Sequence, residues 1–419
     1  DYMELYENEA KPQRALLVCV DTGDYDAQSS LDELWELAES AGAVPVATLT
    51  QKKEKPDTAT YVGSGRLEEI TSFCENQDID LLIFDCELTP TQIRNIEEPA
   101  NVRTIDRTML ILDIFALRAR SKEGKLQVEL AQLKYMLPRL TGKGAAMSRL
   151  GGGIGTRGPG ESKLETDRRH IRKRMETLKE QLADVELHRN MLKSRRKKDG
   201  IITVAIVGYT NAGKSTLMNC LTDAGVLAQD KLFATLDPTS RALKLPSGVT
   251  VMMIDTVGLV RRLPHHLVEA FRSTLEEAAN ADIILHVVDR SSPYYESQMA
   301  VVEDVLSKLG ALDIPRINVY NKCDLTGERT PNDGVFISAA KGTGIDELLE
   351  KIESRINSGR LEVDVVVPYD KYEAMNVIRA EGRILKEDHQ GDGAHLKIQI
   401  NETALWKLKR MLGEGYGQN

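Results

Sequence analysis

The sequence predicts an α/β protein whose largest part is a doubly wound, mostly parallel sheet. Short apolar runs alternate with amphipathic helical patterns in residues 14–106 and again from residue 201, which is typical of successive β-α-β units. In the second region a glycine-rich turn joins an apolar run directly to a helix. The 419 residues are enough for about three domains, and an apolar content of 41% is enough for packed cores.

Residues 1–106 are expected to form an N-terminal α/β subdomain with a parallel sheet. Its buried strands are expected at residues 15–20, 44–49, 81–84 and 102–105. Helical patterns lie between these runs, and the first of them should begin at Ser30 as its N-cap and end at Gly42.

Residues 107–199 are expected to form a long antiparallel helical hairpin. Apolar residues follow a 4, 3, 4, 3 spacing in two segments on either side of a glycine-rich stretch, and two such arms can pack on one another. Pro138 should kink or end the first arm, because proline lacks a backbone N–H. The spaced residues are Leu126, Leu130, Leu133, Leu137 and Leu140 in the first arm, and Ile171, Met175, Leu178, Leu182 and Val185 in the second.

The glycine-rich tip, residues 151–160, contains six glycines and, at residues 153–158, a formal G-x-G-x-x-G. A dinucleotide site would need a strand before this pattern, and a leucine-spaced helix precedes it instead. A flexible linker remains an alternative. The interpretation we favour is a tip whose glycines let the backbone approach nucleic acid closely. The candidate RNA-contacting residues are Arg149, Gly151, Gly152, Gly153, Gly155, Arg157, Gly158, Arg168 and Arg169.

Charge is distributed unevenly along the chain. The net charge is −9, yet residues 139–198 hold 17 Lys or Arg against 7 Asp or Glu, a local net charge of +10 that leaves −19 for the rest. Such an asymmetry indicates a polyanionic partner for the hairpin.

The five cysteines are scattered, which is typical of reduced thiols in a cytoplasmic protein. No apolar run has the ~18 residues that a membrane span needs, so no membrane partner is expected.

The chemistry is concentrated in residues 200–359, where a strand leads into a G-x-x-x-x-G-K-S pattern and then a helix. In this phosphate-binding loop, or P-loop, backbone N–H groups cradle phosphates, the lysine reaches the β- and γ-phosphates, and the serine hydroxyl binds Mg²⁺. The expected nucleotide-binding residues of this loop are Gly208, Tyr209, Thr210, Asn211, Ala212, Gly213, Lys214, Ser215 and Thr216.

Three further motifs follow at the ends of expected strands. Asp255, Thr256, Val257 and Gly258 form D-x-x-G, in which the aspartate holds Mg²⁺ through water and the glycine N–H contacts the γ-phosphate. Asn321, Lys322 and Asp324 belong to N-K-x-D, whose carboxylate can accept both N1–H and N2–H₂ of guanine, which adenine lacks. In Ser338, Ala339 and Ala340, the Ala339 N–H is a candidate donor to guanine O6. In this order, the motifs predict a P-loop GTPase domain that binds GTP or GDP.

Residues 232–239 are expected to be switch I, the segment ordered by the γ-phosphate. Phe233, Ala234, Thr235, Leu236 and Asp237 are its candidate nucleotide-binding residues. Thr235 is the expected Mg²⁺ ligand and γ-phosphate sensor, and Thr239 is its rival. With Lys214 and Gly258, Thr235 completes the expected catalytic set.

Switch II, which follows D-x-x-G, departs from the small signalling GTPases. Leu259 stands where these have a water-orienting glutamine, so unaided hydrolysis should be slow and a partner is expected to complete the site. Arg261 and Arg262 are candidates for stabilising transition-state charge, with solvated surface charges as the alternative. Asn211 resembles the asparagine of potassium-activated GTPases, which makes K⁺ a candidate cofactor beside Mg²⁺.

Residues 360–419 are expected to form a small α+β C-terminal domain. Strand, helix, strand, strand and helix patterns follow one another, with a turn at residues 389–393 between the last two strands. No chemical motif stands out in this part of the chain.

Taken together, the motifs resemble the HflX family of ribosome-associated GTPases. The resemblance is nearly full length and rests on residues 61–70, 105–115, 123–133, 151–169, 208–216, 232–239 and 255–264, of which the run GPGE followed by LETDRR is the most specific. It implies a cytoplasmic, monomeric GTPase that binds the 50S subunit at the factor-binding side, with the hairpin tip directed toward the peptidyl transferase centre of 23S rRNA. It also implies GTP-dependent splitting or rescue of stalled 70S ribosomes, especially after heat stress, and ribosome-stimulated hydrolysis.

Two other functions remain open. One is an RNA-processing, tRNA-modifying or ribosome-assembly GTPase without splitting activity. The other is a signalling switch whose hairpin docks on protein. The basic hairpin favours an RNA partner over a protein-docking coil, which would mix its charges more evenly.

Overall fold

The computed structural model describes residues 12–140, 163–198, 201–222, 232–233, 239–262, 272–326, 334–357, 360–412 and 417–418. Within them the chain forms two compact units. The first unit contains the N-terminal sheet, the first part of the hairpin and the described residues 232–233 and 257–262. The second unit contains the end of the hairpin, the central sheet and the C-terminal sheet.

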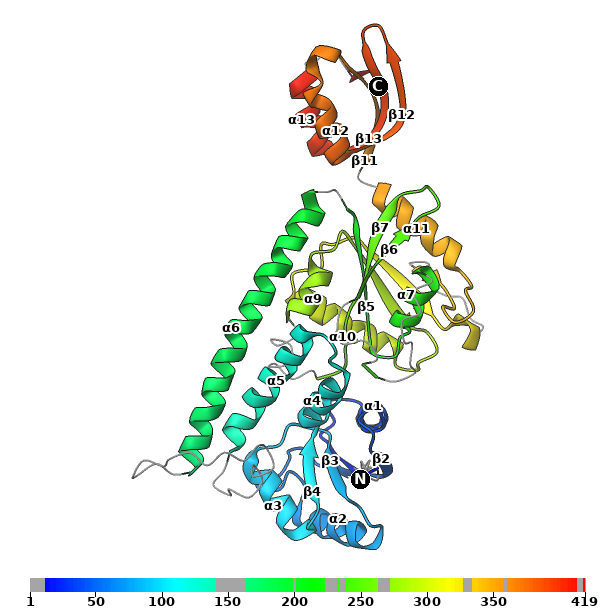
Figure 1. The fold of residues 1–419 in the computed structure, drawn as a ribbon. Coiled ribbons are helices and arrows are strands. Elements are labelled where there is room, and N and C mark those ends of the chain that lie inside the picture. Colours follow the sequence, from blue (N-terminus) through cyan, green and yellow to red (C-terminus); the bar gives the residue numbers. More distant parts are fainter. Residues whose placement is uncertain are drawn as a thin grey trace, which may run out of the picture. The chain divides into compact units, whose positions relative to one another are not determined.

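The N-terminal sheet is four-stranded and parallel, in the order β2-β1-β3-β4 (Figure 1). All four strands lie at the expected apolar runs, and Leu16, Val18, Leu82 and Phe84 are among the residues of the core. The strands are β1 Arg14–Asp21, β2 Val44–Lys52, β3 Leu81–Phe84 and β4 Arg103–Asp106. The helices are α1 Ala27–Ser40, α2 Ser64–Asn76, α3 Pro90–Ala100 and α4 Arg107–Arg118.

The beginning of α1 differs from the sequence prediction. Asp26 is the N-cap, and its carboxylate accepts the backbone N–H of Ser29 at 3.0 Å. Ser30 lies inside the helix and is 1% exposed. Aspartate and serine are about equally good caps, so the sequence alone did not distinguish them.

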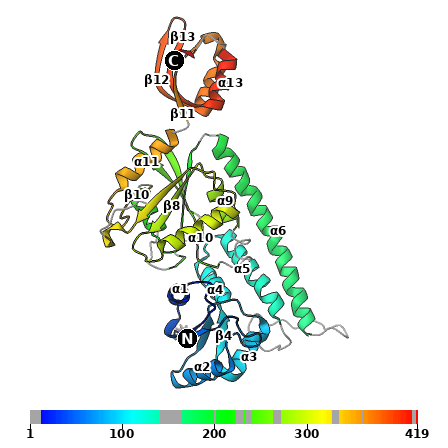
Figure 2. The ribbon, with the colours of Figure 1, turned by 180° about the vertical axis from the view of Figure 1, so that it is seen from behind.

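The hairpin consists of α5 Lys122–Met136 and the 36-residue helix α6 Lys163–Lys198, which lie side by side (Figures 1 and 2). Leu126 and Leu130 of α5 pack on Leu178 of α6, as the leucine spacing predicts. A short 3₁₀ turn, η1 Leu137–Arg139, follows α5, so Pro138 ends the arm rather than kinking it. At ~1.5 Å per residue, α6 is about 54 Å long.

The central sheet has six strands in the order β10-β9-β8-β5-β7-β6, and helices cover both of its faces (Figures 1 and 2). All pairs are parallel except β6 with β7. Strand β6 was not predicted, because its residues TSRALK are mostly polar. The elements are β5 Thr203–Gly208, α7 Lys214–Thr222, β6 Thr239–Lys244, β7 Thr250–Asp255, α9 Arg272–Ala279, β8 Ile283–Asp289, α10 Tyr295–Lys308, β9 Arg316–Asn321, η2 Cys323–Leu325, β10 Gly334–Phe336 and α11 Ile345–Asn357.

The C-terminal sheet is antiparallel, in the order β12-β13-β11-β14. Two helices pack on one face of it, with Val365, Ile378, Ile398 and Leu408 in the shared core. The elements are β11 Arg360–Val367, η3 Tyr369–Lys371, α12 Glu373–Glu381, β12 Gly382–Gln390, β13 Gly393–Asn401, α13 Glu402–Leu412 and β14 Gly417–Gln418. The α/β class, with a small antiparallel sheet at the C-terminus, is therefore confirmed.

Candidate functional site

The P-loop connects the end of β5 to the start of α7, and its backbone requires glycine at two places. Gly213 has φ +90°, and a Cβ there would lie 2.2 Å from Nδ2 of Asn321. At Gly208 a Cβ would lie 2.3 Å from the carbonyl oxygen of Val287. Any larger residue would therefore push the loop off the neighbouring strands. Between them Asn211 also has a left-handed backbone, with φ +60°, which asparagine tolerates better than most residues.

Lys214 and Ser215 of the P-loop are bonded to nearby protein groups. The ammonium group of Lys214, which is 6% exposed, donates to the carbonyl oxygen of Tyr209 at 2.8 Å. The hydroxyl of Ser215 donates to Oδ2 of Asp255 at 3.0 Å. Lys214 and Ser215, which are expected to serve phosphate and metal, thus both bond to protein atoms in the structure. Burial lowers the pKa of Lys214 to about 8, against the opposing effect of the Asp255 charge.

The residues around Asp255 suit a hard cation with few protein ligands. Asp255 is fully buried at the end of β7, and with the Ser215 hydroxyl it brings two oxygen ligands together. These are the ligand types that Mg²⁺ prefers. Among the described residues no group of three or more His, Cys, Asp or Glu could hold a metal ion. A magnesium ion here would thus take most of its ligands from phosphate and water.

Two threonine hydroxyls near these motifs are buried without a hydrogen-bond partner among the described residues. One is Oγ1 of Thr210 in the P-loop, and the other is Oγ1 of Thr239. Thr239, the rival of Thr235 as metal ligand, is the first residue of β6 and lies opposite Asp255 in the sheet register. A buried hydroxyl without a partner costs free energy, so both positions fit a polar ligand.

Asn321 joins the P-loop to the loop after β10. Its Nδ2 donates to the carbonyl oxygen of Ala212 at 2.9 Å, and its Oδ1 accepts the N–H of Ala339 at 3.0 Å. Thr256 similarly ties the end of β7 to β5, because its hydroxyl donates to the carbonyl oxygen of Ile206 at 2.7 Å. The Ala339 N–H is thus engaged by Asn321 in this conformation, and its donation to guanine stays a prediction.

Asp324, the expected guanine reader, is held charged by its neighbours. Hydrogen bonding by Ser338 and then by Lys341 lowers its pKa. Nζ of Lys341 lies 3.3 Å from Oδ2 of Asp324, and Nζ of Lys322 lies 2.8 Å from Oδ2 of Asp289. The sequence analysis did not name Lys341 or Asp289. A lysine directly after the Ser-Ala-Ala run, and an aspartate at the end of a strand, were the available signals.

The two switch segments lie only partly within the described residues. Ala234, Thr235, Leu236 and Asp237 are outside them. Of switch I, Leu232 and Phe233 are described, and in the first unit they are 3% and 2% exposed. Of switch II, Leu259 is 2% exposed in the same unit. A buried leucine has no group that could orient a water molecule, which agrees with the expected slow hydrolysis.

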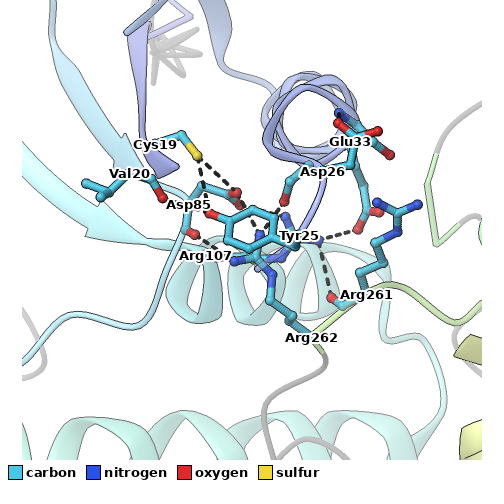
Figure 3. A network of polar contacts seen from close by, with 11 residues as sticks. Cys19, Val20, Tyr25, Asp26, Glu33, Asp85, Arg107, Arg261 and Arg262 are labelled. Atoms are coloured by element: carbon cyan, nitrogen blue, oxygen red, sulfur yellow. Dashed lines mark hydrogen bonds and ion pairs between the residues drawn. The ribbon is translucent and has the colours of Figure 1, made fainter. Parts of the chain in front are cut away.

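Arg262 contacts a polar network in the N-terminal sheet (Figure 3). Its Nη2 lies 2.7 Å from Oδ2 of Asp85, which is buried, and its guanidinium stands over the ring of Tyr25 at 4.5 Å. Arg107 supports the same carboxylate, with Nη1 2.9 Å from Oδ1 of Asp85.

Arg107 also pairs with Glu33 and donates to the carbonyl oxygen of Arg261 at 3.3 Å (Figure 3). The Arg262 side chain is 39% exposed, so it lies partly at the surface. Its guanidinium is nevertheless paired with the carboxylate of Asp85. No motif marks Asp85 in the sequence, because it is one of many acidic residues that follow a strand.

The hairpin residues expected to contact RNA are described only at the start of α6. Arg168 is half-buried and donates to the carbonyl oxygen of Leu140 at 3.0 Å, while Arg169 is exposed. The remaining candidates lie outside the described residues: Arg149, Gly151, Gly152, Gly153, Gly155, Arg157 and Gly158.

No helix within the described ranges is long and apolar enough to cross a membrane.

Family models match nearly the whole chain. They are described as GTP-binding GTPase N-terminal at residues 28–116, GTP-binding GTPase middle region at 118–196, 50S ribosome-binding GTPase at 203–322 and HflX C-terminal domain at 327–419.

Curated relatives and a solved structure also match. A "GTPase HflX" of Caldanaerobacter subterraneus subsp. tengcongensis is 54% identical over 403 residues, covering 96% of this chain and 94% of the relative. A "GTPase HflX" of Escherichia coli (strain K12) is 41% identical over 358 residues, covering 83% and 84%. The crystal structure of a complex of SsGBP and GDP aligns with 26% identity and a TM-score of 0.47, covering 82% of this chain and 98% of that chain. With its P-loop, guanine-recognition motifs and full-length relatives, this chain is a GTPase that belongs to the HflX family.

Proposed function

We propose that this GTPase binds the 50S ribosomal subunit, splits or rescues stalled 70S ribosomes in its GTP-bound form, and is released after ribosome-stimulated hydrolysis. The observation that carries the proposal is the packed α5–α6 hairpin, because residues 139–198 around its tip are the basic part of an acidic chain. The match of residues 203–322 to the 50S ribosome-binding GTPase model supports it.

In the nucleotide site, Lys214 would leave the Tyr209 carbonyl and bridge the β- and γ-phosphates. The hydroxyls of Ser215 and Thr235 would hold a magnesium ion, with Asp255 acting through water. When bound, this ion neutralises charge that develops on the phosphates. The Gly258 N–H would contact the γ-phosphate.

The base would be read by a second group of residues. Asp324 would accept both guanine donors, and the Lys322 stem would cover the ring. Charge on Asp324 is required for this role, and the hydrogen bonds from Ser338 and Lys341 that lower its pKa support it.

Two features of the site leave hydrolysis dependent on other components. Leu259 supplies no water-orienting group, so a ribosomal partner would complete the site, which in other GTPases raises the rate by ~10³ to 10⁵. The role of K⁺ beside Asn211 stays a prediction, which hydrolysis rates in potassium and sodium buffers check.

At the other end of the hairpin, the tip would enter a narrow part of 23S rRNA near the peptidyl transferase centre. Its glycines present no side chains, so the backbone can approach phosphates closely. Arg149, Arg157 and Arg169 would meet phosphates or stack on unpaired bases. The rival function, a ribosome-assembly or RNA-processing GTPase, uses the same contacts but leaves 70S particles intact.

Sedimentation of 70S ribosomes through sucrose gradients separates these two functions. With the protein and a non-hydrolysable GTP analogue, the 70S peak should decrease and the 50S and 30S peaks should increase, whereas GDP should leave the 70S peak unchanged. Persistence of the 70S peak with the analogue, while the protein co-sediments with 50S subunits, would instead support the rival function. GTP turnover that 50S subunits do not stimulate would contradict both.

A further inference from the structure

The side chain of Lys322 is held by an aspartate at the end of the neighbouring strand. Nζ of Lys322 lies 2.8 Å from Oδ2 of Asp289, and the two side chains are only 24% and 15% exposed. Asp289 ends β8 and Asn321 ends β9, and these two residues are partners in the parallel register. The ion pair therefore lies at the carboxyl edge of the sheet, where open α/β sheets bind their ligands.

The carboxylate of Asp289 is itself oriented by the loop that follows β8. Its Oδ1 accepts the backbone N–H of Ser291 at 2.9 Å and the hydroxyl of Ser291 at 2.6 Å. The two carboxylate oxygens thus have different partners, because Oδ1 bonds to the loop and Oδ2 pairs with Lys322. A carboxylate fixed in this way offers the ammonium group one defined position, so the lysine side chain has one favoured course.

The backbone of Lys322 is held independently of this ion pair. Its φ of +61° lies in the left-handed region, which is uncommon for residues other than glycine. Before it, the carbonyl oxygen of Asn321 accepts the N–H of Arg290 at 3.0 Å, and after it the N–H of Cys323 donates to the carbonyl oxygen of Ile337 at 3.1 Å. Since these backbone bonds hold the turn, loss of the ion pair would free the Lys322 side chain and leave the turn in place.

We propose that Asp289 is a positioning residue for the nucleobase, which holds the Lys322 side chain in place to cover the face of the purine ring. A long side chain that becomes ordered only on binding loses rotamer freedom, and this loss weakens binding. The ion pair with Asp289 orders the lysine before the nucleotide arrives. The inference rests on the base-reading role proposed above for Lys322 and Asp324.

The two aspartates at this site would then have different effects on nucleotide binding. Asp324 reads the edge of the base and therefore selects guanine. Asp289 acts through the aliphatic stem of Lys322 on the face of the ring, and every purine has such a face. Asp289 should therefore strengthen the binding of guanine and xanthine nucleotides by the same factor.

Binding of fluorescent GDP to the full chain tests this inference. Asp289→Ala should lower GDP affinity by about two- to tenfold, which is the range expected for the ordering of one long side chain. The affinity for a fluorescent non-hydrolysable GTP analogue should fall by the same factor. Ser291→Ala removes one of the two hydrogen bonds that orient the carboxylate, so it should lower both affinities by a smaller factor.

A double-mutant cycle separates positioning from a general structural role. Lys322→Ala should also lower GDP affinity, and in that background Asp289→Ala should have no further effect, because Asp289 acts only through the lysine. A purely structural role of Asp289 would lower the affinity by the same factor with or without the lysine. In the Asp324→Asn background, Asp289→Ala should lower the affinity for xanthosine diphosphate by the factor measured with GDP in the unaltered protein.

Glu303→Ala is the matched control. Oε1 of Glu303 lies 3.1 Å from Nη2 of Arg316, the first residue of β9, and these side chains are also partly exposed. The control thus removes an ion pair at the opposite end of the strand that precedes Lys322, and it should leave GDP affinity at the wild-type value. If Asp289→Ala does not fold, Asp289→Asn carries the test, because it removes the charge and still accepts from Ser291.

Unchanged or higher GDP affinity in the Asp289 variant would overturn the inference. So would an equal loss in Glu303→Ala, or an undiminished further loss in the Lys322→Ala background. These measurements contain no ribosomes, so a positive cycle without 70S splitting would refute only the proposed splitting. Tight GTP binding by Asp324→Asn would refute the base-reading assignment, whereas independent losses beside a switched Asp324→Asn specificity would refute only the role of Asp289.

Discussion

Asn321 shows how one side chain assembles a nucleotide site from separate loops. Its amide spans from the Ala212 carbonyl of the P-loop to the Ala339 N–H of the loop after β10. Because both ends of the amide are bonded and the residue is 3% exposed, it fixes the spacing between the P-loop and the loop after β10. The sequence motif identifies Asn321 as part of the site, but its bridging role is visible only in the fold.

The base-reading role proposed for Asp324 leads to a prediction about specificity. Asp324→Asn should lower GTP affinity by about 10²- to 10⁴-fold, because two hydrogen bonds to a charged acceptor, at ~1.5–3 kcal/mol each, are lost or reversed. Xanthosine triphosphate should then bind better than GTP, since its 2-oxo group accepts from the new amide. Competition binding measures both affinities, and binding of the xanthine nucleotide also shows that the variant is folded. Tight GTP binding by the variant would refute the assignment.

The lowered pKa of Lys214, about 8, predicts proton uptake on nucleotide binding. Phosphate oxygens favour the charged ammonium, so binding raises this pKa again. At pH 6.5 the lysine is charged before and after binding, and no proton should be taken up. At pH 8.5 part of the lysine is neutral before binding, so uptake should approach one proton and GDP affinity should fall as pH rises further.

Calorimetric titrations with GDP in buffers of different ionisation enthalpy measure this uptake. Lys214→Arg is the control, because arginine stays charged throughout this range and should show no uptake at either pH. Equal uptake at pH 6.5 and pH 8.5 in the unaltered protein would contradict the prediction.

At the level of elements, an apolar stripe packs the two described helices of the hairpin on one another. Its described core is formed by Leu126, Leu130 and Leu178, with Leu133, Met175 and Leu182 partly buried around them. Outside this stripe α6 is strongly polar, and Arg174 forms an exposed ion pair with Glu129, with Nε 2.6 Å from Oε1. Exposed ion pairs contribute little, so the apolar stripe must provide most of the packing energy.

Leu178→Ala should therefore destabilise the α5–α6 pair by about 2–4 kcal/mol, because Leu178 is fully buried. Leu187→Ala on the same helix is the control. Leu187 is 62% exposed, and its loss should change stability by less than about 0.5 kcal/mol. Hydrogen exchange of the α5 and α6 amides measures the local effect, and equal protection in the two variants would show that this stripe does not hold the hairpin.

In the molecule as a whole, a GTPase domain and a basic hairpin belong to one chain whose net charge is negative. The local net charge of +10 in residues 139–198 against −19 elsewhere favours the hairpin as the proposed site of RNA contact. Deleting residues 151–160 should leave GDP and GTP binding unchanged, because the P-loop and base-reading residues are elsewhere. It should abolish 70S splitting in the sucrose-gradient assay, and splitting at the normal rate would remove the tip from the proposed mechanism.

Local patterns in the sequence are enough to predict the motifs, the parallel N-terminal sheet and the paired leucine arms. The P-loop, D-x-x-G and N-K-x-D are short motifs of fixed spacing, whereas the strands and the leucine arms repeat the period of a strand or a helix. The sequence also identified Leu259 as an apolar residue in the place of a glutamine. It failed at β6, whose polar strand has no such period, and at Ser30, where two adjacent caps were equivalent.

Which residues far apart in the chain meet is visible only in the folded protein. The contacts of Arg262 with Asp85 and of Phe233 with Phe115 join positions separated by more than 100 residues. No periodicity encodes such a pairing, because it depends on how whole elements pack and which surfaces they bury together. For that reason the sequence predicted both switch segments as parts of a nucleotide site, while their attachment to the N-terminal subdomain became visible only in the folded chain.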